Sequence, residues 1–415
     1  MVSRRETEER DISAPQGEPP PRLSRTQILV LAVACGITAA NIYFPQAISP
    51  LIAADLHVAP DSAALAVTAT QLGYAAGLFL LVPLGDRVPH KRLILTLLTL
   101  TGLGLLAVSA APTLPLLIAA STLVGATTVV PQVIVPMAAG LVPDERRGAV
   151  VGTLMGGLIA GILLARTFGA TVGEWLGWHA PYQVATVLVL LLGVALAFTL
   201  PTTAPASREP YPALLAAPLR LLMTEPELRR SCLYQAALFA GFNAAWTSLA
   251  LLVTGPVYGL GAQAVGLIAF AGAGSLLCTP IAGRWVDRLG ADLVNLVCIL
   301  CAVVAAVVLS AGSLGGVAGM VALLVGMLLI DTAVQGGQVA NQARIFAIDA
   351  AARGRLNTGY MTCSFLGGSF GSWIGVRTYT HLSWLGVCAL VAVAAVIALA
   401  RHLLRRAPAT VAVRR

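Results

Sequence analysis

The chain has 415 residues, of which 58% are hydrophobic and only 11% are Asp, Glu, Lys or Arg, and its formal net charge is +8. Soluble domains carry about 25% charged residues, so this composition excludes an ordinary soluble protein and indicates an integral membrane protein. The net positive charge is therefore better explained by arginines beside an anionic lipid surface than by nucleic-acid binding. We expect the lipid bilayer, and no nucleic acid, as a partner.

The chain begins with a polar, proline-rich segment, residues 1–26, which we predict to be a disordered tail. The first apolar run after it is long enough to cross a bilayer, so it predicts an uncleaved anchor rather than a signal peptide. A second tail is predicted at the other end of the chain, over residues 405–415.

The rest of the chain is a series of continuous apolar segments, which predicts an all-α, multi-pass membrane protein. A helix rising about 1.5 Å per residue needs about 20 apolar residues to cross the hydrocarbon core. By this criterion we predict twelve transmembrane helices, near 28–49, 63–82, 93–111, 114–137, 149–172, 181–200, 233–255, 264–283, 293–311, 317–339, 356–379 and 384–404.

The widest polar stretch between spans, residues 201–231, predicts a central linker between two six-helix bundles, 27–200 and 232–404. Of the 26 Lys and Arg residues, all but Arg166 and Arg377 fall in the two tails, the linker and the even-numbered connections, or, for Arg401, at the C-terminal end of the last span. Positive residues at span ends are retained in the cytoplasm. We therefore predict a protein of the inner cell membrane whose two termini and central linker are cytoplasmic.

Two connections repeat a motif between the halves. The second half contains Gly283-Arg284-Trp285-Val286-Asp287-Arg288-Leu289-Gly290, which fits Gly-x-x-x-Asp-Arg-x-Gly throughout. The first half keeps the charged residues of the motif but has Val82 and Pro89 in place of its glycines; these charged residues are Asp86, Arg87, Lys91 and Arg92. With two parallel six-span repeats, the chain resembles the major facilitator superfamily (MFS) over nearly its whole length.

The resemblance implies the MFS fold for the chain and a gating role for these two loops. In the family, Asp and Arg of this loop pair between helices and hold the outward-facing state closed on the cytoplasmic side. We therefore expect gating by Asp86, Arg87, Asp287 and Arg288, supported by Lys91, Arg92, Gly283 and Gly290. The alternative is anchoring by positive residues, which would explain the arginines but not the repeated aspartate.

Within the family, the chain looks most like proton-driven antiporters that export drugs, sugars or amino acids. Two positions depart from that branch, because Ser121 stands where an arginine is common in span four and Ile162 follows Gly161 where a proline is common. Import or facilitated diffusion of a small nutrient is the alternative, since alternating access is reversible.

Asp331 is the predicted proton-coupling residue. An ionisable group inside a membrane span is costly and is a functional candidate by default. Asp331, Gln335, Gln338 and Gln342 lie at offsets 0, 4, 7 and 11, within about 60° of one another on a helix. Lipid would not solvate this stripe, so it faces protein or water. Burial disfavours the ionised carboxylate, so we expect Asp331 to bind a proton near neutral pH. A structural hydrogen-bonded cluster is the alternative.

Span seven carries a second stripe, formed by Gln235, Phe239, Phe242 and Trp246, that would suit a partly apolar organic substrate. An aromatic stripe at helical spacing is also what ordinary packing produces. Tyr43 and Phe44 are lesser candidates in span one, near the proline kink at Pro45. The full set of predicted substrate-cavity residues is Asn41, Gln71, Tyr74, Gln132, Gln235, Asn243, Trp246, Gln335 and Gln338.

Arg166 and Arg377 occupy matching positions in spans five and eleven. Both are predicted about 25–32 Å along their helices, near the outer face. They could extend to the outer headgroups. They could instead pair with an anionic substrate group or with Glu174, or form a pair in an outer gate. The glycines of the same spans let helix backbones approach closely. We expect these glycine surfaces to slide between the halves, although tight packing alone would also require glycines.

Together, these features predict a monomeric secondary transporter that exports a small organic molecule in a proton-coupled cycle. The chain has no nucleotide-binding motif and no paired catalytic carboxylates, so an enzyme is not expected, and no metal or cofactor is predicted. The seven cysteines are predicted to be small packing residues. A membrane sensor that transports nothing is the remaining alternative.

Overall fold

A computed structural model describes residues 23–202, 209–272, 274–275, 278–349 and 352–404. The predicted tails 1–26 and 405–415 lie almost entirely outside these residues; only 23–26 are described, and α1 already begins at Arg25.

Within the described residues every regular element is a helix, and no strand is present. The helices are α1 (Arg25–Ala40), α2 (Phe44–Asp55), α3 (Pro60–Ala63), α4 (Leu65–Leu80), η1 (Val82–Asp86), α5 (His90–Ser109), α6 (Leu114–Thr127), α7 (Val130–Gly140), α8 (Asp144–Leu176), α9 (His179–Thr199), α10 (Tyr211–Thr224), α11 (Pro226–Thr254), α12 (Ala262–Gly272), α13 (Cys278–Leu289), α14 (Ala291–Ser310), η3 (Ala311–Leu314), α15 (Gly316–Phe346) and α16 (Arg353–Leu403).

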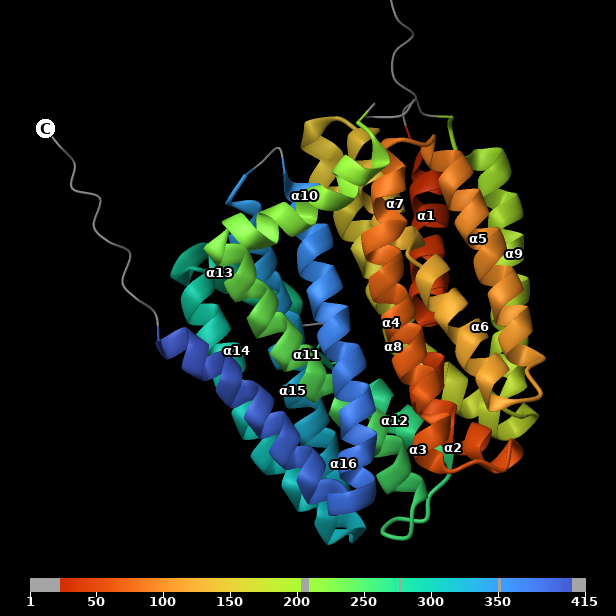
Figure 1. The fold of residues 1–415 in the computed structure, drawn as a ribbon, viewed down its shortest axis with the longest axis vertical. Helices are drawn as coiled ribbons and strands as arrows, with labels where there is room; N and C mark the ends of the chain where they lie inside the picture. Colours follow the sequence, from red (N-terminus) through yellow and green to blue (C-terminus); the bar gives the residue numbers. More distant parts are fainter. Residues whose placement is uncertain (1–22, 203–208, 273, 276–277, 350–351, 405–415) are drawn as a thin grey trace, which may run out of the picture.

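The all-α membrane fold follows from the long apolar runs, because a helix satisfies its own backbone polar groups in lipid. Among the described residues, ten helical segments are long and apolar enough to cross a membrane, and α12 is a shorter apolar helix of 11 residues. α16 has 51 residues, and its backbone leaves the helical region at Ser383. Figure 1 shows its two arms running in opposite directions. The predicted number of spans, twelve, stays a prediction.

The helices form two groups that lie side by side (Figure 1). We call α1–α9 the N-terminal half and α11–α16 the C-terminal half, following the predicted boundaries. The polar stretch predicted as a linker contains α10, which crosses between the two groups. We call this the α10 end of the molecule, and the opposite end, where α2 and α3 lie, the α3 end.

Prolines interrupt two of the long apolar segments of the N-terminal half. Pro45 is at the start of α2 and Pro131 at the start of α7. Because proline lacks the backbone N–H that the preceding turn requires, each segment is divided into two helices. The first break occupies residues 41–43 and carries Asn41 and Tyr43 into the protein interior, where both side chains are buried.

The helix-backbone contacts of the glycine stripes lie within each half, so the predicted sliding surface between the halves is wrong. On α8, a Cβ at Gly157 or Gly161 would collide with the backbone of α1, at Ala32 and Gly36. On α16, Gly367, Gly371 and Gly375 meet the backbone of α11 in the same way. Small residues here allow close helix pairs that strengthen each half as a unit.

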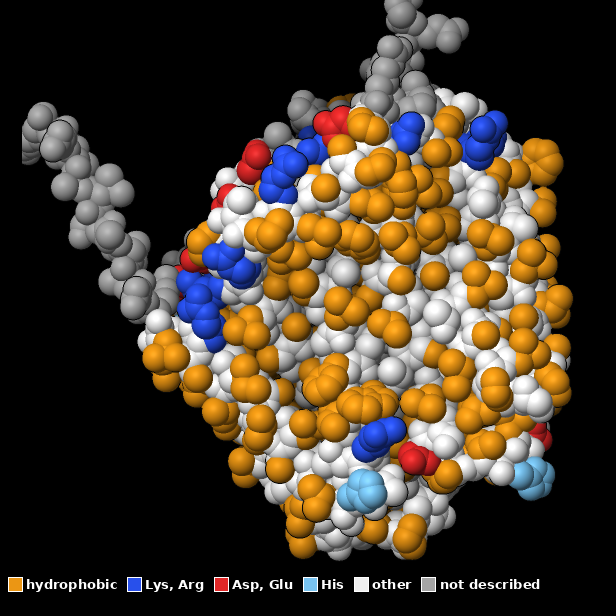
Figure 2. All heavy atoms as spheres, viewed as in Figure 1, with side chains coloured by type: hydrophobic (Ala, Val, Ile, Leu, Met, Phe, Trp, Pro, Cys, Tyr) orange, Lys and Arg blue, Asp and Glu red, His pale blue; other side chains and the backbone are white. Residues whose placement is uncertain are grey.

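The surface agrees with a membrane setting. Figure 2 shows hydrophobic side chains over the middle of the face, with most Lys, Arg and acidic side chains gathered along the α10 end. Large exposed apolar residues include Leu103 on α5, Phe198 on α9 and Val307 on α14. Lipid would cover these side chains in a bilayer.

Candidate functional site

A buried polar network joins the two halves. Asn243 lies on α11 and is fully buried, and its Oδ1 accepts hydrogen bonds from two amides of the other half. Gln71 Nε2 on α4 donates at 2.6 Å, and Gln46 Nε2 on α2 donates at 2.9 Å. Asn243 Nδ2 donates to Phe239 O on its own helix, at 2.9 Å, which fixes the orientation of the amide. One side chain of the C-terminal half is thereby held by two helices of the N-terminal half.

Arg166 extends this network. Its Nε donates to Gln46 Oε1 at 2.9 Å, and the side chain is only 3% exposed. The Arg166 Cζ lies 4.1 Å from the ring centroid of Trp246, 4.9 Å from that of Tyr43 and 5.5 Å from that of Phe242. A guanidinium over aromatic faces gains a cation–π attraction that strengthens when water is excluded. Arg166 therefore does not extend to the outer surface, as one sequence interpretation allowed.

Asp331 completes the network on α15. Its side chain is 6% exposed, and its Oδ1 accepts a hydrogen bond from Trp246 Nε1 at 3.1 Å. Trp246 thus contacts the carboxylate of Asp331 with its indole N–H and the guanidinium of Arg166 with its ring face. Asp331 and Arg166 attract each other electrostatically, although they form no direct ion pair. The site therefore places one carboxylate, of Asp331, and one guanidinium, of Arg166, around the indole of Trp246.

Aromatic rings surround the amides. Tyr74 of α4 and Phe365 of α16 face each other across the halves with ring centroids 4.4 Å apart. Phe239 stacks on Phe242 at 5.5 Å, and Phe242 meets the edge of Trp246 at 6.4 Å. The predicted stripe of α11 therefore borders the network, while its first member, Gln235, is buried with an unpartnered Oε1.

The other predicted cavity residues lie around this centre rather than in it. Gln132 Nε2 donates to Tyr74 Oη at 3.4 Å, and Asn41 Nδ2 donates to Thr128 Oγ1 at 3.4 Å. Gln335 and Gln338 are only partly buried, and they follow Asp331 along α15 toward the α10 end. The polar stripe thus leads from the network toward the arginine-rich end of the molecule.

The two arginines that match in sequence differ in structure. Arg377 is exposed, and its guanidinium stacks over the Trp373 ring at 4.6 Å. It lines a small cavity of about 70 Å³ at the α3 end, together with Asp61 and Thr68 of the N-terminal half. The sequence repeat therefore does not predict a shared environment for Arg166 and Arg377.

At the α3 end, α8 and α12 make polar contacts between the halves. Glu174 Oε2 accepts a hydrogen bond from the backbone N–H of Gln263 at 2.6 Å, near the start of α12. Thr167 Oγ1 donates to Gly266 O at 2.9 Å. A carboxylate at a helix N-terminus is favoured by the helix dipole. Glu174 therefore contacts α12 and not Arg166, which was one of the sequence alternatives.

The predicted gating loops are mostly exposed. Asp287 and Arg288 are exposed on α13, and in the described part of the chain neither side chain forms a hydrogen bond or an ion pair. Asp86 interacts electrostatically with Arg355 of the C-terminal half, which also pairs with Glu209 at 2.9 Å. The remaining loop residues are Arg87, Lys91, Arg92, Gly283 and Gly290, and gating by them stays a prediction.

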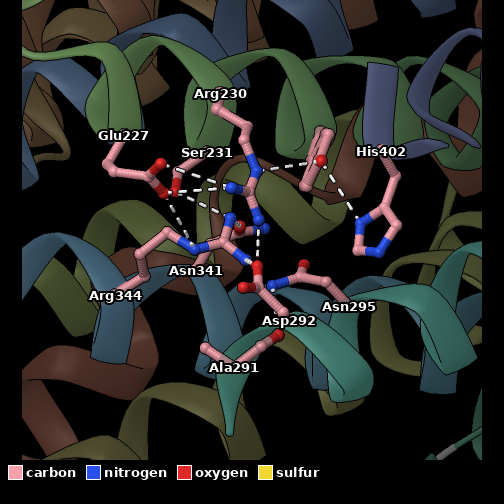
Figure 3. Close-up of polar contacts among 10 residues, drawn as sticks. Glu227, Arg230, Ser231, Ala291, Asp292, Asn295, Asn341, Arg344 and His402 are labelled. Carbon is pink, nitrogen blue, oxygen red and sulfur yellow. Dashed lines mark hydrogen bonds and ion pairs between the residues drawn. The ribbon is translucent and has the colours of Figure 1, made fainter. Parts of the chain in front are cut away.

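A second charged cluster lies inside the C-terminal half near the α10 end (Figure 3). Arg230 of α11 and Arg344 of α15 both bind the carboxylates of Asp292 and Glu227. Arg230 Nε also donates to Tyr234 Oη at 3.0 Å. The cluster ties α11, α14 and α15 together within one half, so we assign it to the rigidity of that half.

Comparison with known proteins decides the family. The model of the Major Facilitator Superfamily matches residues 29–372. The chain belongs to this family. It is 36% identical over 371 residues to YgaY of Escherichia coli (strain K12), named as a transporter, covering 89% of this chain and 93% of YgaY. It is 28% identical over 273 residues to a chloramphenicol resistance protein of Streptomyces lividans, covering 64% of this chain and 68% of that protein.

A solved structure supports the MFS fold of this chain. The crystal structure of a point mutant of the nucleoside transporter NupG superposes with a TM-score of 0.72. The match covers 91% of this chain and all of that chain, at 14% sequence identity. At this identity the likeness concerns the fold alone. The MFS member described here is accordingly a membrane transporter with an MFS fold.

Sequence reasoning missed Gln46, which links Arg166 to Asn243. An amide within a long apolar segment, one residue after Pro45, was the signal that could have identified it. Tyr43 was only a lesser candidate, yet it forms one wall of the Arg166 site.

Proposed function

We propose that this MFS member exports a small organic molecule from the cell by alternating access in a proton-coupled cycle. It acts as a monomer in the inner cell membrane, with the α10 end and both termini in the cytoplasm. The observation that carries the proposal is the buried network around Asp331 and Arg166, to which both halves contribute. Export is also supported by similarity to a protein named for chloramphenicol resistance.

The network connects ligand binding with movement of the halves. Its inter-half hydrogen bonds join neutral amides, each contributing about 0.5–1.5 kcal/mol, so they can break during a transport cycle. The close backbone contacts of the α8 and α16 glycines lie within the halves, so each half can move as a unit. Opening at the α3 end would separate Asn243 from Gln46 and Gln71 and expose Asp331 to the opposite side of the membrane.

Asp331 is the proposed proton-binding residue. Burial disfavours its charged form, whereas Arg166 and the Trp246 N–H favour it, so a moderate change in surroundings can change its protonation. Those surroundings differ between the two orientations of a transporter, because contacts to Arg166 on the N-terminal half change.

The test compares wild type with Asp331→Asn in an efflux-deficient bacterial strain challenged with toxic organics and metabolite analogues. Glu209→Gln is the matched control, because it neutralises an exposed carboxylate in the linker. Protection by wild type and by the control, lost in Asp331→Asn at equal membrane expression, supports export and the proton site. Full protection by Asp331→Asn would contradict its role, and greater sensitivity with wild type would indicate import.

A further inference from the structure

We propose that Arg166 binds a carboxylate of the substrate, and that the substrate is an aromatic or similarly planar organic anion. The inference rests on the proposed function only in taking the Arg166–Asp331 network as the transport site. It adds the chemical class of the substrate and the sign of its coupling to protons.

The first argument is that Arg166 is a buried cation with incomplete hydrogen bonding. Its Nη2 is buried and has no partner, and its Nε binds only the neutral amide oxygen of Gln46. No carboxylate of the described residues forms an ion pair with it. A buried charge is costly unless it is paired and hydrogen-bonded, and a carboxylate is the group that fits the guanidinium fork. A substrate carboxylate would supply the absent partner.

The second argument concerns the body of the substrate. The guanidinium is surrounded by the rings of Tyr43, Phe242 and Trp246, at 4.9, 5.5 and 4.1 Å from their centroids. Phe239 and Phe365 continue this aromatic wall, with ring centroids 5.1 Å apart. Stacked or edge-on contacts between rings favour a planar, aromatic ligand. The amides of Gln71 and Asn243 would orient its polar substituents.

The third argument is access. Gln335 and Gln338 extend from Asp331 toward the α10 end and remain partly exposed. At the α3 end, Glu174 and Thr167 hold α12 against α8. The stripe therefore marks a polar approach to Arg166 from the α10 end.

Arg166 also determines how the anion and a proton influence each other. Two titratable groups face Asp331: Arg166, which is charged, and the phenol of Tyr43, which is neutral while protonated. The Trp246 N–H donates to Asp331. Arg166 stabilises ionised Asp331, and a substrate carboxylate would neutralise Arg166. Anion binding therefore favours a proton on Asp331, and protonation of Asp331 favours anion binding. The proton and the anion would cross together with no net charge added, so a cytoplasmic excess of the acid would drive export and an inward proton gradient would oppose it.

Equilibrium binding to the purified full chain in lipid nanodiscs tests this inference without requiring transport. The probes are radiolabelled benzoate, salicylate and indole-3-acetate, each compared with its neutral amide. We expect at least one acid to bind wild type about tenfold more tightly than its amide, as for a charge-assisted pair, and more weakly as the pH rises from 6 to 8. Arg166→Gln should abolish the preference for the acid, whereas Asp331→Asn should bind the acid equally at both pH values.

The control is Arg220→Gln, which removes an exposed arginine of α10 and should bind as wild type does. If Arg166→Gln does not fold, Arg166→Lys keeps the charge without the fork and should bind the acid more weakly while still preferring it over the amide. Equal binding of every acid and its amide to wild type, or unchanged acid binding in folded Arg166→Gln, would overturn the inference. Asp331→Asn could still lose export after such a result. The proposed function and this inference can therefore be contradicted independently.

Discussion

Gln71 Nε2 donates a 2.6 Å hydrogen bond to Asn243 Oδ1, joining α4 of one half to α11 of the other. Because Asn243 also accepts from Gln46, a single carbonyl oxygen holds two helices of the N-terminal half. Unlike the backbone contacts of the α8 and α16 glycines, which lie within the halves, these bonds lie between them. They therefore bear on the equilibrium between conformations more than on the stability of either half.

Asn243→Ala should shift the protein toward opening at the α3 end. The substitution removes two hydrogen bonds between the halves and leaves two buried amide donors unpaired, at about 1–3 kcal/mol per unsatisfied group. The measurement is the labelling rate of a cysteine at Thr68, which lines the small cavity at the α3 end, by an impermeant maleimide. We expect labelling to accelerate severalfold.

Asn295→Ala is the matched control for that experiment. Asn295 is also a buried asparagine whose Nδ2 donates to a carbonyl four residues earlier in its own helix, at 2.9 Å, but it lies within the C-terminal half. Its removal should leave the labelling rate unchanged. Equal acceleration in both variants would show that general loosening, rather than loss of the inter-half bonds, explains the effect.

Glu174→Ala should weaken closure of the α3 end by removing a different contact between the halves. The carboxylate caps α12 from the other half, and a negative group at a helix N-terminus contributes about 0.3–1 kcal/mol. We expect a twofold to fivefold faster labelling of the same cysteine. Asp55→Ala removes a carboxylate at the same end whose hydrogen bond, accepted from Trp178 Nε1 at 2.9 Å, lies within the N-terminal half, and should have no such effect. No change with Glu174→Ala would show that this cap does not control opening.

The sequence predicted the all-α MFS fold, and it named several residues that lie in the buried network. Apolar span lengths predicted the helices, and helical spacing placed Trp246 on a face that borders the network containing Asp331. The position of a residue in a span gives its depth along the helix, but it does not give the neighbours of its side chain. Arg166 and Arg377 therefore matched in sequence, while only Arg166 faces α2 and α11 and is buried. Gln46 was missed because the break before Pro45 changes the face that each following residue presents.

Gly161→Val should reduce the stability of the N-terminal half. A Cβ at Gly161 would collide with the backbone of Gly36 on α1, where no flexible side chain can move aside. Overpacking of this kind costs about 1–3 kcal/mol. Gly156→Val, on the same helix, is the control, because its Cβ meets no atom within 4 Å. Thermal unfolding in detergent should show a lower midpoint for Gly161→Val alone, and equal midpoints would contradict the packing described for α1 and α8.

Asp292→Asn should destabilise the C-terminal half by removing the carboxylate shared by two arginines. The Arg230 and Arg344 side chains are only 5% and 8% exposed, so each depends on its acidic partners. Breaking a fully buried ion pair costs about 3–5 kcal/mol, but Asp292 is 35% exposed. Solvent screening should reduce the loss to about 1–3 kcal/mol. Unfolding in denaturant measures this loss in the free energy of unfolding.

The control for the charged cluster is Glu209→Gln, which breaks the Arg355–Glu209 pair, whose side chains are 41% and 49% exposed. Exposed pairs contribute about 0–1 kcal/mol and weaken with salt. The Asp292→Asn loss should persist at high salt, because the two arginines remain buried side by side, whereas the small Glu209→Gln loss should disappear. Similar losses and similar salt dependence in both variants would show that the Asp292 cluster behaves as a surface network and does not hold α11, α14 and α15 together.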